Sequence, residues 1–363
     1  MKHTPLKKSA VTLAVISGLF AQAVVAEEII IDKPNTTFTG QAWTDKVTIQ
    51  KDALGKDSVV TLSGITANNS VPIGAEHLDG GTLNIQNSTL RGGIEISGEG
   101  SVNISDTKYI RDIGAGGNAN VSLSNVEASS NAYDSSITAK EQASVTGNNI
   151  KTAFASAGGN SQMTLNNSFM KTTREGRGTI SAIGAGSLTL NNSRIEVKLG
   201  GNDGTITLNN SRWTGAWDRE GKGTVALNAG TVWNVTGESA KPDDSLGTLA
   251  VSDSSLILAA ANVRAKTLSG SNALIHSTFD EAKGVFRTLT ADKAEGDFRV
   301  ALASTGKNIS AAEQAALAAP VVVVKDGDST ATFSGSSDLG TWAYDAVART
   351  AEAGGTEVVL VKS

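Results

Sequence analysis

The chain has 363 residues, a formal net charge of −5 at pH 7, no cysteine, 39 glycines and only 4% aromatic residues. The acidic balance disfavours nucleic acid and anionic lipid as partners, and the absence of cysteine excludes disulfide bonds. The composition approaches that of a disordered chain, but a regular alternation of aliphatic residues argues against disorder.

Residues 1–26 have the pattern of a secretory signal peptide. Three lysines lie within the first eight residues, an apolar run follows at 10–20, and small residues lead up to Ala26. The apolar run is too short to span a membrane as a helix. We therefore expect export with cleavage after Ala26, and the loss of the three lysines takes the formal charge from −5 to −8.

A short motif repeats along the following sequence. Its clearest copies are the segments 163–168, 188–193 and 206–211, which all end in Leu-Asn-Asn-Ser. A period near 20 residues is typical of a solenoid in which one coil repeats, so function must lie on the surface and loops of a rod. Aligned on the turn residue, the copies follow one another at steps of 18 to 25 residues, at Asn87, Asp106, Asn125, Asn149, Asn167, Asn192 and Asn210.

Alternation within each coil predicts short strands joined by tight turns. The segment 194–199 alternates charged with aliphatic residues, and the glycine-rich segment 200–204 then turns the chain into the next strand at 206–208. Stacked coils should place Leu190 over Leu208 inside the rod. We predict an all-β fold, a right-handed parallel β-helix of about ten to thirteen coils and about 50–60 Å in length.

The turn residues should form a ladder on this rod. Asn167, Asn192 and Asn210 would lie above one another and satisfy turn main-chain groups one coil away. Trp213 and Trp233 are 20 residues apart, which is one coil. We expect these two rings to stack in the core or in a groove.

The repeat fades after about residue 300. A helix or linker is expected at 311–319, a buried strand at 321–324, and further strands up to residue 361. These elements predict an antiparallel cap over the last coil, whose sheet edges would otherwise be exposed. We divide the chain into a signal peptide at 1–26, a β-helical stalk at 27–204, C-terminal coils at 205–307 and a cap at 308–363.

From about residue 205 onward the sequence resembles the C-terminal half of pertactin-like autotransporter passengers. The resemblance is carried in order by Asn209-Asn-Ser-Arg-Trp-Thr-Gly-Ala216, Val232-Trp-Asn-Val-Thr-Gly237, Ser245-Leu-Gly-Thr-Leu249, Lys266-Thr-Leu-Ser-Gly270 and Leu339-Gly-Thr-Trp-Ala-Tyr344. It implies an exported β-helical stalk whose C-terminal part is a folding seed of the autochaperone type. Many such passengers act in adhesion or cell–cell aggregation.

Passengers of this family are exported through a β-barrel fused to their C-terminus. No run of amphipathic strands typical of such a barrel precedes Ser363. We expect a separately supplied outer-membrane barrel, a truncated or split autotransporter, or residence in the periplasm.

The sequence offers little for catalysis. The mature chain has only two histidines, His77 and His276, and no G-x-S-x-G motif. The segment 327–330 resembles the surroundings of a protease nucleophile but lacks the glycine that should follow. The segment 200–204 resembles a single copy of the calcium-binding nonapeptide, which needs tandem copies to build a site.

The nearest approach to a polysaccharide-cleaving site is a group of charges around Asp203, with Asp218 and Glu220 near Arg212 and Arg219. Solvated turn charges are the simpler interpretation of this group. We expect no catalytic residue, no cofactor and no metal.

The coil between Asn167 and Asn192 is longer than most and contains a mixed-charge protrusion. Our candidate binding residues are Lys171, Arg174, Glu175 and Arg177 in that loop, with Trp217 nearby as a ring for sugar stacking.

We predict a non-enzymatic exported passenger that acts in adhesion or self-association. Its partner would be a host surface receptor, a glycan or a second copy, and its place the surface or surroundings of a Gram-negative bacterium, or the periplasm. The alternatives are a polysaccharide-active enzyme on the same scaffold and a stalk or folding fragment of a split autotransporter.

Overall fold

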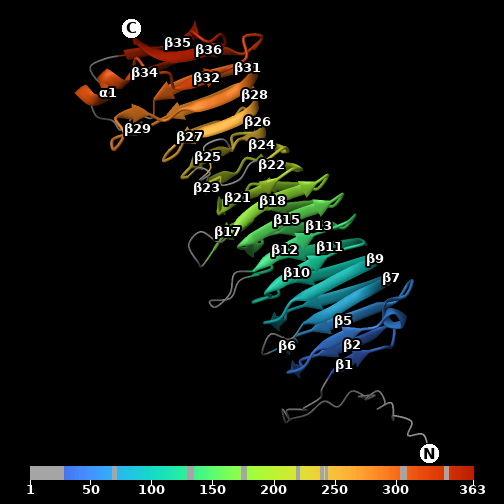
Figure 1. Ribbon diagram of the computed structural model, residues 1–363. Coiled ribbons are helices and arrows are strands. Elements are labelled where there is room, and N and C mark those ends of the chain that lie inside the picture. The colour runs from blue at the N-terminus through green and yellow to red at the C-terminus, as the bar shows by residue number, and fades with distance from the viewer. Residues whose placement is uncertain are drawn as a thin grey trace, which may run out of the picture.

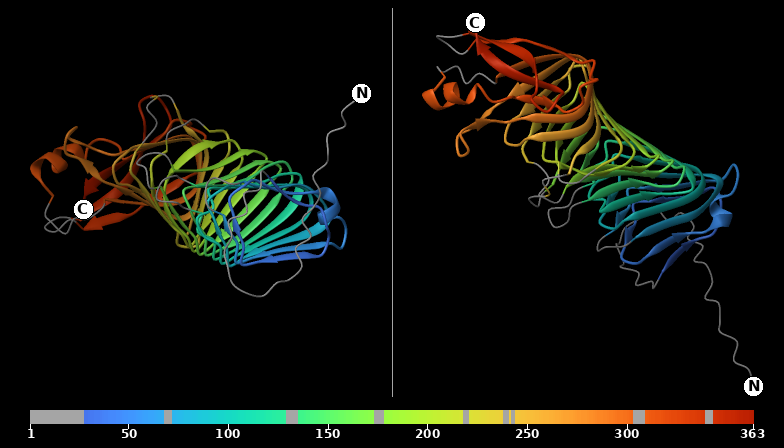
Figure 2. Two further views of the ribbon diagram at one scale, coloured as in Figure 1. Left: turned by 90° about the horizontal axis from the view of Figure 1, so that it is seen from below. Right: turned by 45° about the horizontal axis from the view of Figure 1, so that its top comes forward.

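The computed structural model describes residues 28–67, 72–128, 135–172, 178–217, 221–237, 241, 244–302, 309–338 and 343–363. The predicted signal peptide lies outside these ranges. The described chain winds into a rod, a β-solenoid of about 11 turns, with the first coil at one end and the C-terminal strands at the other (Figures 1 and 2). The predicted parallel solenoid is thereby confirmed.

Each coil contributes short strands to three parallel sheets that run along the rod. The first sheet contains β1 (Ile29–Ile31), β4 (Val47–Ile49), β10 (Asp112–Ala115), β12 (Ser136–Ala139), β15 (Phe154–Gly159), β18 (Thr179–Gly184) and β21 (Lys198–Asn202). The long strands β7 (Ile73–Gln86) and β9 (Ile94–Ser105) bend from this sheet into the second.

The second sheet follows the first in every coil. Its further strands are β2 (Thr36–Thr39), β5 (Val59–Ser63), β11 (Asn118–Ser124), β13 (Ser144–Asn148), β16 (Gln162–Asn166), β19 (Ser187–Asn191), β22 (Thr205–Asn209), β24 (Thr224–Asn228) and β26 (Leu246–Ser252). The register runs without a break from β19 through β22 to β24.

The third sheet completes the coil. It contains β3 (Ala42–Trp43), β6 (Thr66–Ala67), β8 (Thr89–Leu90), β14 (Lys151–Thr152), β17 (Phe169–Lys171), β20 (Arg194–Glu196), β23 (Arg212–Gly215), β25 (Val232–Val235) and β27 (Ser255–Leu258). Near the C-terminal end, the long strand β28 (Val263–Ser277) pairs with β26 of the second sheet and with β27 of the third sheet, and β31 (Leu289–Leu302) pairs with β28 along most of its length. Two small elements do not belong to the three sheets. They are a 3-10 turn at Lys51–Leu54 and the hairpin of β29 (Phe279–Asp280) and β30 (Val285–Phe286).

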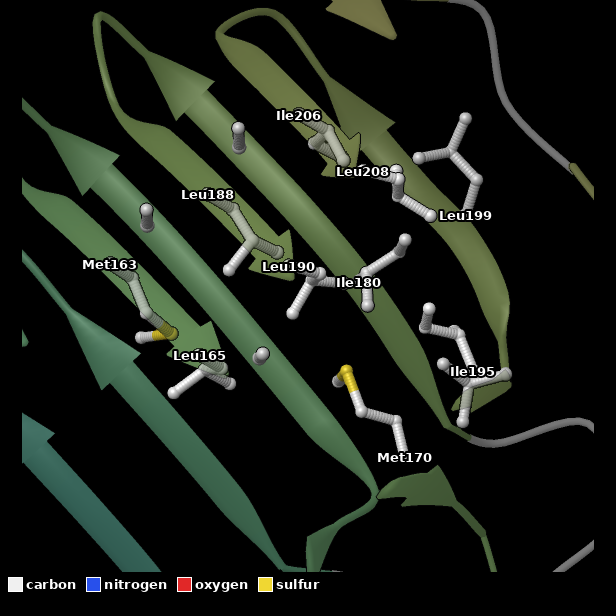
Figure 3. Packing of buried hydrophobic residues seen from close by; sticks show 14 of the residues in the cluster. Met163, Leu165, Met170, Ile180, Leu188, Leu190, Ile195, Leu199, Ile206 and Leu208 are labelled. Carbon is white, nitrogen blue, oxygen red and sulfur yellow. The ribbon is translucent and has the colours of Figure 1, made fainter. Parts of the chain in front are cut away.

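The core consists of aliphatic columns, because inward side chains at one register position stack coil on coil. Met163, Leu188 and Ile206 form one such column (Figure 3). Beside it Leu190 pairs in register with Leu208, as predicted, and all five side chains are at most 1% exposed. Like residues thus meet like residues along the axis, and in these coils aliphatic side chains fill the interior.

One left-handed residue turns the chain from the second sheet into the third. All seven turn positions predicted from the repeat, from Asn87 to Asn210, have φ between 47° and 57°. Asn and Asp tolerate this conformation better than other side chains, and Gly40 and Gly64 occupy the same place in the first coils. The N–H of Asn192 donates to the carbonyl of Asn209 in the next coil at 2.9 Å, so the turn itself continues the ladder.

A buried serine follows the turn and links neighbouring coils. The Ser193 hydroxyl donates to the carbonyl of Asn191 at 2.8 Å and accepts from the main-chain N–H of Ser168 at 3.0 Å. Ser211 in turn accepts from the N–H of Ser193 at 3.0 Å, and Thr231 accepts from that of Ser211 at 3.2 Å. Each hydroxyl therefore satisfies an N–H of the preceding coil that the dry interior would otherwise leave unpaired.

A column of glycines marks the corner between the first and second sheets. Gly186, Gly204, Gly223 and Gly247 follow one another there, and a Cβ on any of them would collide with a main-chain carbonyl of the preceding coil. Glycine is required because the backbones of adjacent coils approach closely at this corner. The glycine that ends the segment 200–204 therefore has a steric reason to be there without any bound ion.

The C-terminal strands fold over the last coil and change the direction of pairing. β32 (Val322–Val324) still runs parallel to β31, but β36 (Thr356–Lys362) pairs antiparallel with β32 and with β35 (Ala343–Thr350). The predicted antiparallel cap is thus confirmed, and it ends the stacking of parallel strands. β33 (Thr332–Ser334) pairs with β31 and β34 (Ser336–Asp338) with β35.

A short helix α1 (Ala311–Ala316) lies beside the cap (Figure 1). Ser310 and Glu313 form a capping box at its start. None of the helices in the described ranges has the length and hydropathy that a membrane span requires.

We expect Ser193→Ala to lower the free energy of unfolding by about 1–3 kcal/mol, because it leaves the N–H of Ser168 without a partner inside the rod. Ser187→Ala is the matched control, since it removes a partly exposed hydroxyl from the outer side of the same coil. Urea denaturation followed by circular dichroism measures both. Equal losses in the two variants would contradict the role of the buried hydroxyl.

Gly204→Ala should also destabilise the rod, by about 1–3 kcal/mol, because the new methyl group overpacks the corner between coils. Gly201→Ala is its control, since a Cβ at Gly201 meets no atom within 4 Å. Thermal unfolding of the two variants compares them directly. A Gly204→Ala protein as stable as Gly201→Ala would show that the coils can separate at this corner without cost.

Candidate functional site

Three outward positions of the second sheet are free of charge over most of the rod, whereas the column beside them contains the exposed Asp79 and Glu99 of β7 and β9. We call the charge-free positions the neutral face and define it by three outward residues in each strand from β5 to β28. These residues are Val59, Thr61, Ser63, Thr82, Asn84, Gln86, Ser101, Asn103, Ser105, Asn120, Ser122, Ser124, Ser144, Thr146, Asn148, Gln162, Thr164, Asn166, Ser187, Thr189, Asn191, Thr205, Thr207, Asn209, Thr224, Ala226, Asn228, Thr248, Ala250, Ser252, Thr267, Ser269 and Ser271. All lie in the described ranges, and none is ionisable.

Side-chain amides are linked from coil to coil along one edge of the neutral face. Asn191 donates to Asn166 at 2.7 Å, Asn209 donates to Asn191 at 2.7 Å, and Asn228 donates to Asn209 at 3.2 Å. Asn166, Asn191 and Asn209 are the first asparagines of the Asn-Asn-Ser motif, and Asn228 takes the same place in the next coil, whereas the predicted ladder contained only the second asparagines. Each linked amide fixes its neighbour and still has a second N–H that can donate outward.

The second asparagines lie beside this edge, at the exposed turn. Asn210 donates to the side-chain oxygen of Asn192 at 2.7 Å, so successive turns are joined through side chains and not through the main-chain group that we expected, because the N–H of Asn192 already donates to the carbonyl of Asn209. Asn167 instead donates to Asn148, a residue of the neutral face, at 2.8 Å. The turn column and the edge of the neutral face are therefore joined by hydrogen bonds into one polar ridge.

All three tryptophans of the C-terminal coils are in the core. Trp213 and Trp233 stack in successive coils with 4.1 Å between ring centroids and 6° between planes, and neither is exposed. Trp217 is also fully buried, at a position in register with Leu199, and its Nε1 donates to the carbonyl of Asn262 at 3.2 Å. The expectation that Trp217 offers a ring for sugar stacking is wrong, because no part of its ring reaches the surface.

The outward side of the third sheet has the opposite character and is rich in cations. We call it the charged face and define it by its outward residues between β8 and β23. These are Thr89, Arg91, Lys108, Glu127, Lys151, Phe169, Lys171, Arg194, Glu196, Arg212 and Thr214.

Lys171, one of the predicted binding residues, is an exposed member of this face. Its Nζ lies 3.1 Å from Glu196 Oε2, and Arg194 forms a second ion pair with the same carboxylate. The Arg194 guanidinium also lies 5.5 Å from the ring centroid of Phe169. Lys171 therefore has a partner within its own chain.

The electrostatic environment of Glu196 reflects this pairing. Desolvation by burial raises the pKa of its carboxyl, but hydrogen bonds from Lys171 and Arg194, together with their charges, outweigh that effect and lower the pKa below its ordinary value. Glu196 is thus held ionised between two cations. The other predicted loop residues, Arg174, Glu175 and Arg177, lie outside the described ranges.

The residues considered for catalysis are scattered along the rod. His77 is exposed in β7, whereas His276 is partly buried in β28, where desolvation and the charge of Arg299 lower its pKa. Ser329 belongs to the cap and donates to the carbonyl of Ala294. Among the described residues no group of three or more His, Cys, Asp or Glu is placed to hold a metal ion.

The group of charges around Asp203 does not form a catalytic pair in the part of the chain that the structure describes. Asp203 is exposed and accepts from the main-chain N–H of Lys222 at 3.3 Å, and Arg212 belongs to the charged face. Asp218, Arg219 and Glu220 lie outside the described ranges.

An open depression of about 400 Å³ lies over the first coils, lined by Lys46, Thr48, Ile49, Gln50, Lys51, Asp52, Gly74, Glu76 and His77. Lys51 there forms an exposed ion pair with Asp79 at 3.1 Å. The depression has the volume of a small-ligand pocket but is open to solvent on one side, so the long faces are candidates for recognition beside it.

No protein-family model matches the chain, and no curated protein matches its sequence. Several solved structures resemble it, among them the following two. The autotransporter UpaB from E. coli strain CFT073 is 22% identical, with 93% of this chain and 76% of that chain covered and a TM-score of 0.42. The Haemophilus influenzae Hap adhesin is 16% identical, with 87% of this chain and 41% of that chain covered and a TM-score of 0.47.

Trp217→Ala should lower the free energy of unfolding by about 3–5 kcal/mol, because it removes a large ring from the core. Thr214→Ala, an exposed change in the same coil, should have little effect. The unfolding midpoints of both variants in urea test this. An unchanged midpoint for Trp217→Ala would contradict the buried position of the ring.

Proposed function

We propose that this chain is the exported, non-enzymatic passenger of an autotransporter-type system and acts in adhesion, with self-association between rods as its first activity. The observation that carries the proposal is the neutral face. Charged residues make up 18% of the chain, yet none of them occupies this face. A surface whose role is only to keep a rod soluble needs charge, so its exclusion from one long face favours a contact surface.

The neutral face has the dimensions of a protein interface. Eleven strands at about 4.8 Å make it about 50 Å long, and three alternate residues make it about 13 Å wide. The resulting area of roughly 650 Å² per rod is close to the roughly 800 Å² per partner of a standard interface.

The chemistry of the neutral face suits a second copy. In a two-fold symmetric pair the same surface is present on both sides, so any charge on it would meet like charges near the axis. Hydroxyl and amide groups are both donors and acceptors and therefore complement themselves. Their repeat at every coil lets many weak hydrogen bonds form together, which raises the total affinity.

The asparagine ladder also lowers the loss of conformational entropy that such a contact requires. Asn166, Asn191, Asn209 and Asn228 are already held by hydrogen bonds within the rod. Side chains that are fixed before binding lose less conformational entropy when a partner arrives. Adhesion to a receptor or glycan and location at the cell surface are parts of the same proposal.

The double variant Thr164→Lys with Thr189→Lys tests self-association, because it brings like charges together at the middle of the neutral face. We expect the mature chain to associate reversibly, and the variant to associate at least about tenfold more weakly. Sedimentation velocity over a range of concentrations measures this.

The matched control is Thr138→Lys with Thr179→Lys, which adds the same charge to the outward side of the first sheet. It should associate like the original protein. A mature chain that stays monomeric at every concentration, or a control that loses association equally, would overturn the proposal.

A further inference from the structure

We propose that the charged face binds a linear acidic polysaccharide. This goes beyond self-association and is independent of it, because it concerns the third sheet and different side chains.

Positive charge is concentrated on this face, although the chain as a whole has a net negative charge. The charged face has six cations and two carboxylates, whereas the chain has a formal net charge of −5. The cations are Arg91, Lys108, Lys151, Lys171, Arg194 and Arg212. A local excess of one sign raises the concentration of oppositely charged ligands near that surface.

Four of the six cations lie on one line along the rod, together with one carboxylate and one ring. Lys108, Glu127, Lys151, Phe169, Arg194 and Arg212 occupy one register column in six successive coils. At about 4.8 Å per coil the column extends about 24 Å. This length suits an extended polymer with repeated charges better than a single small anion.

Several of these cations are available to a ligand. Lys108, Lys151 and Arg212 are exposed, and none of them forms an ion pair with another residue in the described ranges. Glu196 holds Lys171 and Arg194 in place and offsets only one of their two charges. The face therefore keeps a net positive charge after its internal pairs are counted.

A second copy is a poor occupant of this face. An antiparallel pair would bring two faces of net positive charge together, with Lys108 opposite Arg212 at both ends of the column, and faces of like charge repel each other across an interface. Carboxylate or sulfate groups on the partner remove that repulsion and accept hydrogen bonds from lysine and arginine.

The surroundings favour a polysaccharide over a nucleic acid. The strip is narrow, because the adjacent neutral face contributes no cation, and the acidic chain as a whole repels a duplex. Single-stranded nucleic acid needs a series of rings on which bases stack. Tyr109, 41% exposed next to Lys108, and the partly buried Phe169 lie about three coils apart and do not form a series, but a single ring is enough for a sugar contact.

The test compares four immobilised probes with the mature chain: dextran sulfate, polygalacturonate, neutral dextran and an oligothymidylate. We expect binding to at least one acidic polysaccharide that weakens as salt is raised, and none to neutral dextran. A preference for dextran sulfate assigns a sulfated ligand, and a preference for polygalacturonate assigns a uronate ligand.

The variant with Lys108→Gln, Lys151→Gln and Arg212→Gln should bind at least about tenfold more weakly, because three unpaired cations are removed. Its matched control is Lys56→Gln with Lys140→Gln and Lys293→Gln, which changes the net charge equally at exposed positions elsewhere. The control should bind within about twofold of the original protein, since distant charges are screened. Unfolding midpoints verify that both variants fold.

The proposal is overturned if neither acidic polysaccharide binds, if the control variant loses as much affinity as the charged-face variant, or if the oligothymidylate binds more tightly than both polysaccharides. The charged-face variant should still self-associate in sedimentation velocity. Failure of polysaccharide binding is therefore distinguishable from failure of self-association.

Discussion

The hydrogen bond between a buried hydroxyl and the main chain of the preceding coil is the interaction on which the rod depends. At the corner after the second sheet the backbone must turn sharply in an interior without water, and a left-handed residue makes the turn possible. The turn leaves an N–H such as that of Ser168 pointing along the axis, where Ser193 of the next coil accepts it. Because the donor and the acceptor belong to different coils, a coil is complete only when its neighbour is in register.

That register produces the long faces. Once Leu190 must lie over Leu208, every outward residue also lies over its counterpart, whatever the length of the loops between. A preference for one type of residue at one position of the repeat then produces a column of such residues some tens of ångströms long. The neutral face arises from a preference for hydroxyls and amides, and the charged face from a preference for cations.

Much of the fold could be predicted from the sequence, because its signals are local. The turn residues and the inward aliphatic positions both recur within a few residues of Asn-Asn-Ser, and alternation supplies the rest. Burial of Trp217 could not be predicted in this way, since its Nε1 partner is the carbonyl of Asn262, 45 residues away. The glycine column could not be predicted either. Gly204 and Gly223 must be glycine because a Cβ there would collide with carbonyls of the preceding coil, and the sequence does not show which coil positions meet.

The candidate surfaces could be predicted only in part, for a related reason. Lys171 was singled out by the charge of its loop, but its ion pair with Glu196 joins two coils of different length. The neutral face can be recognised only when the register of many coils is known. That register cannot be read from the sequence, because the loops between the strands differ in length. Arg174, Glu175 and Arg177 remain predictions.

The two faces adjoin along the left-handed turns, and this arrangement has a consequence for binding. If two rods pair through their neutral faces as we propose, the pair hides hydroxyls and amides but leaves both charged faces open to solvent. A two-fold axis then places two cationic columns in one particle. A polysaccharide long enough to reach both would bind the second column at a high effective concentration. Self-association would therefore strengthen polysaccharide binding without any change at the charged face, and a weak single contact would be sufficient for a firm attachment.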